Sequence, residues 1–239
     1  MENFFCGSKL DRLSEKRNDS AFILGSLRTE NAEFIVFDSL SPLALENTNN
    51  NALNYTLFVI CYKEVLQCFQ GSPSLASAAE EEVVGTLLKK GLIVLLGQSE
   101  NSSRENDSKP LQNDRENQPK YHFAVDVTSC KTQINDLIAK RHVAAKYLSS
   151  RGDIFMLSQK DAAFVAQGRS MLDWNKRYAF CPTCGAHTDA DDAGYKRTCV
   201  EKNCSSNKGI NSAYHNTDDN FKAIICTEQS EILSSGSCK

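Results

Sequence analysis

Four cysteines in the C-terminal part of this 239-residue chain constrain its folding more than any other feature. They follow the spacing C-x2-C-x14-C-x4-C through Cys181, Cys184, Cys199 and Cys204. The first pair predicts a knuckle that turns at Gly185, and the second pair predicts a hairpin that turns at 191–194. Four thiolates in this pattern favour a closed structural zinc site, with a pair of disulfides as the alternative.

The choice between metal and disulfides depends on the compartment. No apolar run reaches the roughly 20 residues of a membrane span, and the N-terminus lacks the order of a signal peptide. These features predict a soluble cytoplasmic chain with no membrane partner, in which thiols stay reduced and free to bind a metal. The other cysteines lack ligand spacing and are expected to be ordinary thiols: Cys6, Cys61, Cys68, Cys130, Cys226 and Cys238.

Charge argues against direct nucleic-acid binding. The formal net charge is −3, from 27 basic and 30 acidic residues mixed along the chain. No whole-chain field would attract a polyanion. The cysteine segment carries only a small basic patch, without a recognisable aromatic platform: Lys196, Arg197, Lys202 and Lys208.

The fold class predicted is α+β, with a mixed N-terminal β-sheet and helices. Apolar runs indicate strands at 21–25, 33–37, 56–62, 91–97 and 121–127. A helix is expected within 74–91, before the fourth of these runs. The polar segment 98–120 has the composition of a disordered surface loop, and we expect it to join two strands of one sheet.

Two further helices are expected before the cysteines, at 132–151 and 158–178. The first has an apolar stripe of Ile134, Leu137, Ile138, Ala145 and Leu148. The second begins at Ser158, and one of its faces carries Phe164, Gly168, Met171 and Leu172. Trp174 and Phe180 are expected to be packing residues, with base stacking as the alternative, and His187 a surface histidine.

The segment "SMLDWNKRYAFCPTCGAHTDADDAGYKRTC" resembles the NADH pyrophosphatases of the Nudix superfamily. In that family a helix ending in Trp precedes FC-x2-CG, a glycine-containing hairpin and a second cysteine pair. "LDRLSEKRNDS", "GLIVLLGQ", "YHFAVDV" and "KDAAFVAQGRSMLDW" follow the order of the family's N-terminal domain. The resemblance covers most of residues 1–204.

This resemblance implies hydrolysis of the pyrophosphate of NADH or NAD to nicotinamide mononucleotide and AMP, or removal of NAD caps from RNA. Magnesium or manganese is implied for a full-length member, held by the Nudix box G-x5-E-x7-R-E-x2-E-E-x-G. No such box stands in this sequence, and the acidic run at 80–84 is expected to be a solvated helix face. The chain is therefore expected to be inactive alone. The alternative is a non-catalytic zinc-bound module that forms a homodimer, or a heterodimer with a full-length relative.

The resemblance also divides the chain. It implies an N-terminal domain at 1–157, a connecting helix at 158–180, a zinc ribbon at 181–213 and the start of a Nudix domain at 214–239. Tyr214 matches a family tyrosine on the substrate side, and an incomplete hairpin is expected from residue 221. The final "SCK" resembles but does not match the peroxisomal Ser-Lys-Leu signal, so the cytoplasm is the expected location and the peroxisome the family alternative.

Overall fold

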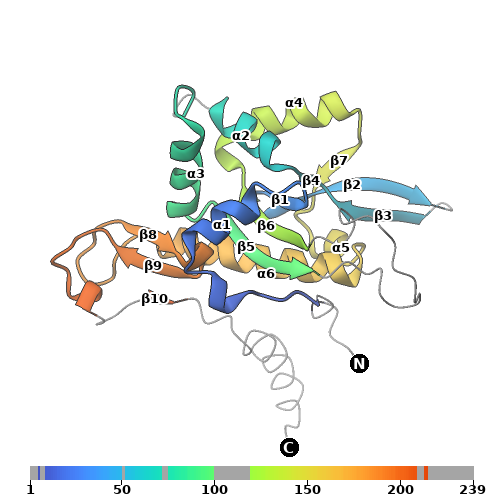
Figure 1. The fold of residues 1–239 in the computed structure, drawn as a ribbon. Helices are drawn as coiled ribbons and strands as arrows, with labels where there is room; N and C mark the ends of the chain where they lie inside the picture. The colour runs from blue at the N-terminus through green and yellow to red at the C-terminus, as the bar shows by residue number, and fades with distance from the viewer. Residues whose placement is uncertain are drawn as a thin grey trace, which may run out of the picture.

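The structure is a computed structural model that describes residues 5, 9–49, 52–71, 75–99, 119–208 and 213–214. It confirms the mixed α+β class (Figure 1). The helices are α1 Ser20–Leu27, α2 Tyr62–Gln70, α3 Glu80–Lys89, α4 Lys131–Arg141, α5 Arg151–Ile154 and α6 Gln159–Arg177. Short 3-10 turns lie at η2 Ser14–Lys16, η3 Thr128–Cys130, η4 Asp192–Gly194 and η5 Ser205–Lys208.

The described strands form two sheets. The larger has the order β3-β2-β1-β6-β5, with β4 added to β1 and β7 added to β2. The pair β1 and β6 is parallel, and the other pairs are antiparallel. The smaller sheet has the order β10-β9-β8. The bounds are β1 Ala32–Asp38, β2 Ser41–Asn49, β3 Ala52–Leu57, β4 Val59–Ile60, β5 Ile93–Ser99, β6 Lys120–Asp126, β7 Ala145–Tyr147, β8 Thr188–Asp191, β9 Lys196–Cys199 and β10 Ala213–Tyr214.

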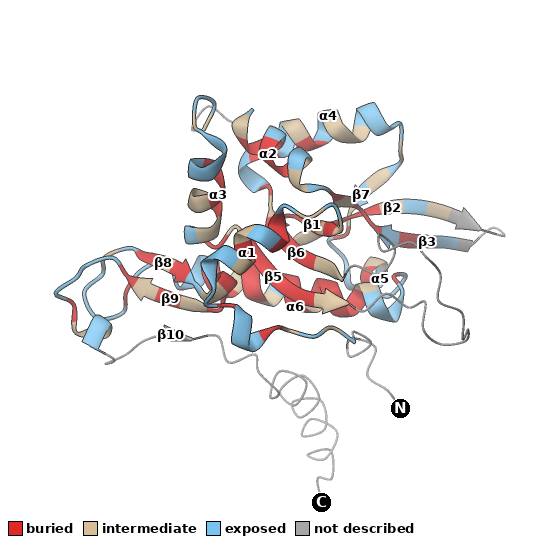
Figure 2. Cartoon of the chain, in the orientation of Figure 1, coloured by how far each residue is buried: buried red, intermediate tan, exposed pale blue. Residues whose placement is uncertain are grey.

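The larger sheet is buried on both faces, which Figure 2 shows as nearly continuous red along its central strands. Phe34 and Val36 of β1 belong to the core that includes side chains of α1 to α4. The alternate residues Ile35 and Phe37 belong to a second core that includes side chains of α6. Two covered faces explain why these strands appear in the sequence as continuous apolar runs rather than alternating patterns.

The predicted loop at 98–120 is correct in its connection and wrong at its ends. β5 and β6 do pair in one sheet, but β5 continues to Ser99 and β6 begins at Lys120. Ser99 pairs with Lys120 in register, and the Ser99 hydroxyl lies 2.9 Å from Nε2 of His122. Polar composition hid these strand ends, because sheet pairing does not require apolar side chains at the last residues. Residues 100–118 lie outside the described part of the chain.

The strand predicted at 21–25 is wrong, because those residues lie in helix α1. The Asp19 carboxylate accepts hydrogen bonds from the backbone amides of Ala21 and Phe22, each at 3.0 Å. This N-cap satisfies amides that would otherwise lack partners at the start of the helix. A short apolar run does not distinguish a strand from a helix, and here the preceding aspartate decides.

The strand predicted at 56–62 is also wrong in extent. β3 ends at Leu57, β4 covers only Val59–Ile60, and Cys61 precedes helix α2. The Glu64 carboxylate accepts a hydrogen bond from the Cys61 amide at 2.8 Å, which favours helix initiation there. The acidic run at 80–84 lies in α3 as expected, and its three glutamates are exposed.

Of the two helices expected before the cysteines, the second is confirmed and the first is too long. α4 ends at Arg141, since His142 adopts a left-handed conformation with φ of 50°. Ala145 then pairs with Leu45 of β2, so a tertiary pairing replaces the helix that the stripe predicted. In α6 the Ser158 hydroxyl caps the helix by accepting from the Asp161 amide at 3.0 Å.

The predicted hairpin beyond residue 221 lies outside the described residues. α6 falls within the connecting helix expected at 158–180, and the four domain boundaries stay predictions. None of the described helices combines the length and the apolar character needed to cross a membrane.

Candidate metal centre

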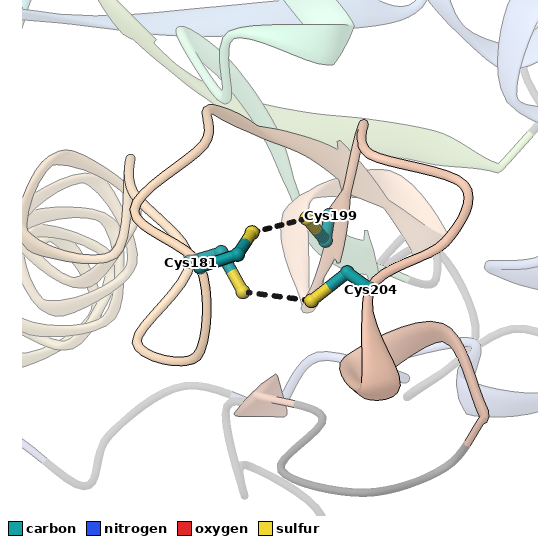
Figure 3. Close-up of side chains that lie close together, drawn as sticks. Cys181, Cys199 and Cys204 are labelled. Carbon is teal, nitrogen blue, oxygen red and sulfur yellow. Dashed lines mark hydrogen bonds between the residues drawn. The ribbon is translucent and has the colours of Figure 1, made fainter.

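The four cysteines come together as their spacing predicts. Their sulfur atoms all lie within 4.8 Å of one another, and none of the four forms a disulfide. The sulfur of Cys181 lies 3.7 Å from that of Cys204, and the sulfur of Cys184 lies 3.5 Å from that of Cys199. Figure 3 shows Cys181, Cys199 and Cys204 with their sulfur atoms turned toward a common centre.

These separations match a four-sulfur cage around one metal ion. A disulfide would bring two sulfurs to about 2.05 Å. A tetrahedral zinc with bonds of about 2.3 Å places its sulfurs about 3.8 Å apart. The cluster therefore has the donor atoms and the spacing to hold a metal ion such as zinc.

The first cysteine pair lies on a tight turn that aims both sulfurs inward. The Gly185 amide donates to the carbonyl of Cys181 at 2.9 Å, and the Cys181 amide donates to the carbonyl of Ala186 at 2.7 Å. Gly185 has φ of +76°, a backbone conformation that a side chain at this position would strain. The glycine is thus required by the turn, as the sequence pattern indicates.

A neighbouring hydroxyl and burial shift the pKa values of the cysteine thiols in opposite directions. Hydrogen bonding with Ser206 lowers the pKa of Cys181 to about 5 and also lowers the pKa of Cys204. Burial raises the pKa of Cys199 to about 12. A bound cation would favour the thiolate at every position, and would therefore offset this cost of burying charge.

We call residues 181–208 the cysteine ribbon. Its hairpin pairs β8 with β9, with Thr188 opposite Cys199 and Asp191 opposite Lys196. The predicted turn at 191–194 contains residues of positive φ, namely Asp192 and Ala193, followed by Gly194 at φ of +96°. A Cβ on Gly194 would lie 2.8 Å from a methyl group of Val94 in β5. The turn therefore rests directly against the larger sheet.

A buried polar network fixes the ribbon hairpin to the sheet. The Tyr195 hydroxyl donates to the carbonyl of Leu95 at 2.8 Å and accepts from the Gln167 amide at 3.0 Å. The Asn175 amide donates to the carbonyl of Gly194 at 2.9 Å. Tyr195, Gln167 and Asn175 are each no more than 3% exposed. Buried groups with satisfied hydrogen bonds specify one arrangement, so the ribbon has a defined position on α6 and β5.

Arg197 belongs to this network and not to a basic surface patch, which corrects the sequence-based interpretation. Its guanidinium donates to both the hydroxyl and the carbonyl of Thr188, at 2.9 and 2.6 Å, and to the Asn175 side chain at 3.2 Å. Burial lowers the pKa of Arg197, and the side chain is 5% exposed. The spacing of residues in the sequence did not indicate that Arg197 would be buried in this network.

The aromatic residues before the cluster differ from one another. Trp174 is 7% exposed, which confirms packing, whereas Phe180 is 57% exposed and was wrongly expected to pack. His187 is exposed and lies outside the four-sulfur set, as expected. The Phe180 and His187 rings contact each other at 4.6 Å between centroids. An exposed pair of rings that the sequence did not reveal therefore lies at the start of the ribbon.

Other candidate positions lie apart from the cluster. Tyr214 belongs to β10 and pairs with Lys196 of β9, and its expected substrate role stays a prediction. Among the thiols expected to be ordinary, Cys68 and Cys130 are buried and Cys61 is exposed.

A cavity of about 510 Å³ lies between α1, α3 and the ribbon turn. Side chains of both charges line it, so it favours no single class of ligand.

Comparison with known proteins finds no family model that matches the sequence. The chain is similar to NAD-capped RNA hydrolase NUDT12 of Macaca fascicularis, with 29% identity over 222 residues, which cover 91% of this chain and 44% of that protein. The human protein of the same name is 29% identical over 225 residues, with the same shares covered. An NAD-capped RNA hydrolase of Schizosaccharomyces pombe is 27% identical over 241 residues, covering 96% of this chain and 59% of that protein.

The chain is thus similar over most of its length to proteins named as NAD-capped RNA hydrolases, and it spans less than half the length of the two primate proteins. This similarity agrees with the resemblance that the cysteine segment indicated. Each of these relatives is named for an RNA substrate, so the names weigh against the charge-based expectation that direct nucleic-acid binding is unfavourable.

Proposed function

We propose that this chain is part of a Nudix-type diphosphatase that hydrolyses the pyrophosphate of NAD-capped RNA, NADH or NAD. The observation that carries the proposal is the similarity over 91% of the chain to proteins named as NAD-capped RNA hydrolases. The four-sulfur cluster supports it, because this cluster lies in the segment that resembles the NADH pyrophosphatases.

The proposed ion in the cluster is Zn²⁺, held by Cys181, Cys184, Cys199 and Cys204. Four thiolates complete a tetrahedral zinc site, so no position stays open for a water molecule. The proposed role of the metal is structural. It would hold the two ends of the ribbon together, while the network around Tyr195 holds the hairpin against the sheet.

The proposed contribution of these 239 residues is support rather than chemistry. Within the described ranges, the cysteine cluster is the one group of three or more side chains arranged to hold a metal ion. Magnesium or manganese at a diphosphatase centre needs oxygen ligands, which the Nudix box supplies in the family. We therefore propose that pyrophosphate hydrolysis requires a Nudix domain in addition to these 239 residues.

The test measures zinc content and AMP release on the purified 239-residue chain. The substrates are NADH and an NAD-capped RNA, each with magnesium or manganese, and the Schizosaccharomyces pombe relative is the positive control. We expect about one zinc per chain and no AMP above the blank. We then expect activity when the chain is fused to the Nudix domain of that relative.

Three outcomes would contradict parts of the proposal. AMP release by the chain alone would mean that these residues contain a catalytic carboxylate set. A chain that binds no zinc would contradict the proposed zinc site. A fused protein that holds zinc and still leaves both substrates intact would contradict the proposed reaction. Light scattering on the same sample tests the alternative of a homodimer, since it measures the molar mass directly.

A further inference from the structure

Apolar side chains are exposed within the cysteine ribbon and in the residues just before it. Tyr178, Phe180 and Val200 are 42%, 57% and 50% exposed, and they lie immediately before or within the ribbon. They are half of the large hydrophobic side chains that are strongly exposed among the described residues. Their concentration in one short part of the chain requires an explanation, because single exposed apolar residues are common but grouped ones mark binding surfaces.

Backbone pairing places Val200 beside His187 and His187 beside Phe180, and Tyr178 precedes Phe180 by two residues. The Phe180 and His187 rings lie 4.6 Å apart at an interplanar angle of 35°, and the two residues form a β-bridge. The Val200 amide donates to the carbonyl of His187 at 3.1 Å. We call Tyr178, Phe180, His187 and Val200 the aromatic face. Since more than half of Phe180 is exposed, its ring leaves area open for a further flat group.

Cationic side chains flank the aromatic face. Lys176, Arg177 and Lys202 are exposed and lie within two residues of Tyr178 or Val200. Arg177 is paired with Asp173 at 2.6 Å, so it contributes little free charge. Glu201 is the exposed acidic residue next to Val200. The two lysines therefore supply a modest positive field beside the rings, as a groove that follows a phosphate backbone requires.

The chemistry favours a single-stranded nucleic acid over a protein partner. Exposed aromatic rings stack on nucleobases whatever their sequence, and adjacent cations bind phosphates. Lysines flank this face on both sides in the sequence, where their charges can meet the phosphates of a strand whose bases stack on the rings. We propose that the aromatic face binds single-stranded RNA by base stacking. This inference rests on the proposed function for the source of the strand, the RNA that follows an NAD cap.

The closest contrast within the molecule is Phe155. This side chain is 56% exposed, almost the same as Phe180, but its ring contacts Phe5 at 5.8 Å, in a region remote from the ribbon in the sequence. Phe155→Ala is therefore a control variant matched to Phe180→Ala in residue type and exposure. Both side chains are exposed, so both variants should fold and keep their zinc.

The experiment measures the binding of a fluorescein-labelled RNA of about 12 nucleotides, long enough for a typical single-strand site. The RNA carries no NAD cap, and anisotropy reports binding to the zinc-loaded chain. We expect Phe180→Ala to weaken binding by about five-fold or more, Phe180→Trp to retain it, and Phe155→Ala to leave it unchanged. Affinity should fall with salt, with a log–log slope of about −0.7 for each phosphate contacted.

Trp174 offers a local readout. It is the one tryptophan of the chain, and its ring lies 5.4 Å from the ring of Tyr178. A base that stacks on Tyr178 should change the tryptophan emission at the same RNA concentration that raises the anisotropy. The emission of Phe155→Ala should change in the same way as that of the unaltered chain.

Equal RNA affinity of Phe180→Ala and the unaltered chain would overturn the proposal. So would equal binding of an RNA duplex, whose bases are not free to stack. If Phe180→Ala instead lowers the molar mass of the chain, the face is a protein interface and the proposal is wrong. These outcomes are separate from those of the proposed function, because the probe contains no NAD and no hydrolysis is measured.

Discussion

The larger sheet and the cysteine ribbon are both built of short strands, but they are held by different interactions. The sheet buries large side chains such as Phe34 and Phe123 completely, and their rings stack at 5.1 Å. The core cluster of the ribbon consists of cysteine side chains. Burial of apolar area stabilises the sheet, whereas the ribbon is held by hydrogen bonds to the sheet and by the metal ion proposed for its four cysteines. The two regions should therefore respond to different perturbations.

The largest effect expected is loss of a sulfur ligand. Cys199→Ser should abolish zinc binding, because structural zinc contributes about 10–16 kcal/mol of apparent binding free energy in small domains. Metal analysis should find no zinc, and hydrogen exchange should show lost protection in β8 and β9 while β1 and β6 stay protected. Cys61→Ser is the control, since Cys61 is an exposed thiol outside the cluster. Loss of protection throughout the sheet would show that the two regions are not separable.

The next largest effect concerns the sheet. Phe123→Ala should lower the free energy of unfolding by about 3–5 kcal/mol, the usual cost of removing a buried phenylalanine ring. Urea titration measures this change, and the protein that stays folded should keep its zinc. Leu53→Ala is the control, because Leu53 is 40% exposed. Zinc loss from folded Phe123→Ala would contradict the independence of the two regions.

A smaller effect is expected where the two regions meet. Tyr195→Phe removes the hydroxyl that contacts Leu95 and Gln167, and should cost about 1–3 kcal/mol by leaving buried groups without partners. Hydrogen exchange should report the loss first in the ribbon hairpin. Tyr178→Phe is the matched control, since Tyr178 is 42% exposed and an exposed substitution should change stability by less than about 0.5 kcal/mol. Equal effects of both variants would mean that the network does not dock the ribbon.

The smallest effect expected is on acid stability. Burial by itself would raise the pKa of Glu33, but its interactions with His122 and Lys120 outweigh burial and lower this pKa below the ordinary value of 4.5. A pKa that is lower in the folded state than in the unfolded state stabilises the protein above about pH 4.5. This contribution disappears as the pH falls through the pKa of the folded state. Glu33→Gln should remove this contribution to the free energy of unfolding, which is less than about 1 kcal/mol because Glu33 is partly exposed. Urea midpoints from pH 7 to pH 3 measure it, and an unchanged pH profile would refute the assignment.

Much of the site was predictable from the sequence. The spacing of the cysteines predicted their convergence, because two close pairs joined by a hairpin have few other ways to place their sulfurs. Ser158 predicted the start of α6 for a similarly local reason. The helix at 20–27 was missed although its signal, the N-cap Asp19, stood in the sequence. The strand β7 had no local signal, since it exists through its pairing with β2.

By itself the sequence determined the four-sulfur set and its glycine turn, since ligand chemistry and left-handed backbone conformations depend on residues close together in the chain. Only the tertiary structure decided that Arg197 is a buried docking residue and that Phe180 is open to solvent. The physical reason is that burial depends on which distant segment packs against a side chain. The partners of Arg197 illustrate this, because they come from α6 and β8 as well as from the residues that precede β5.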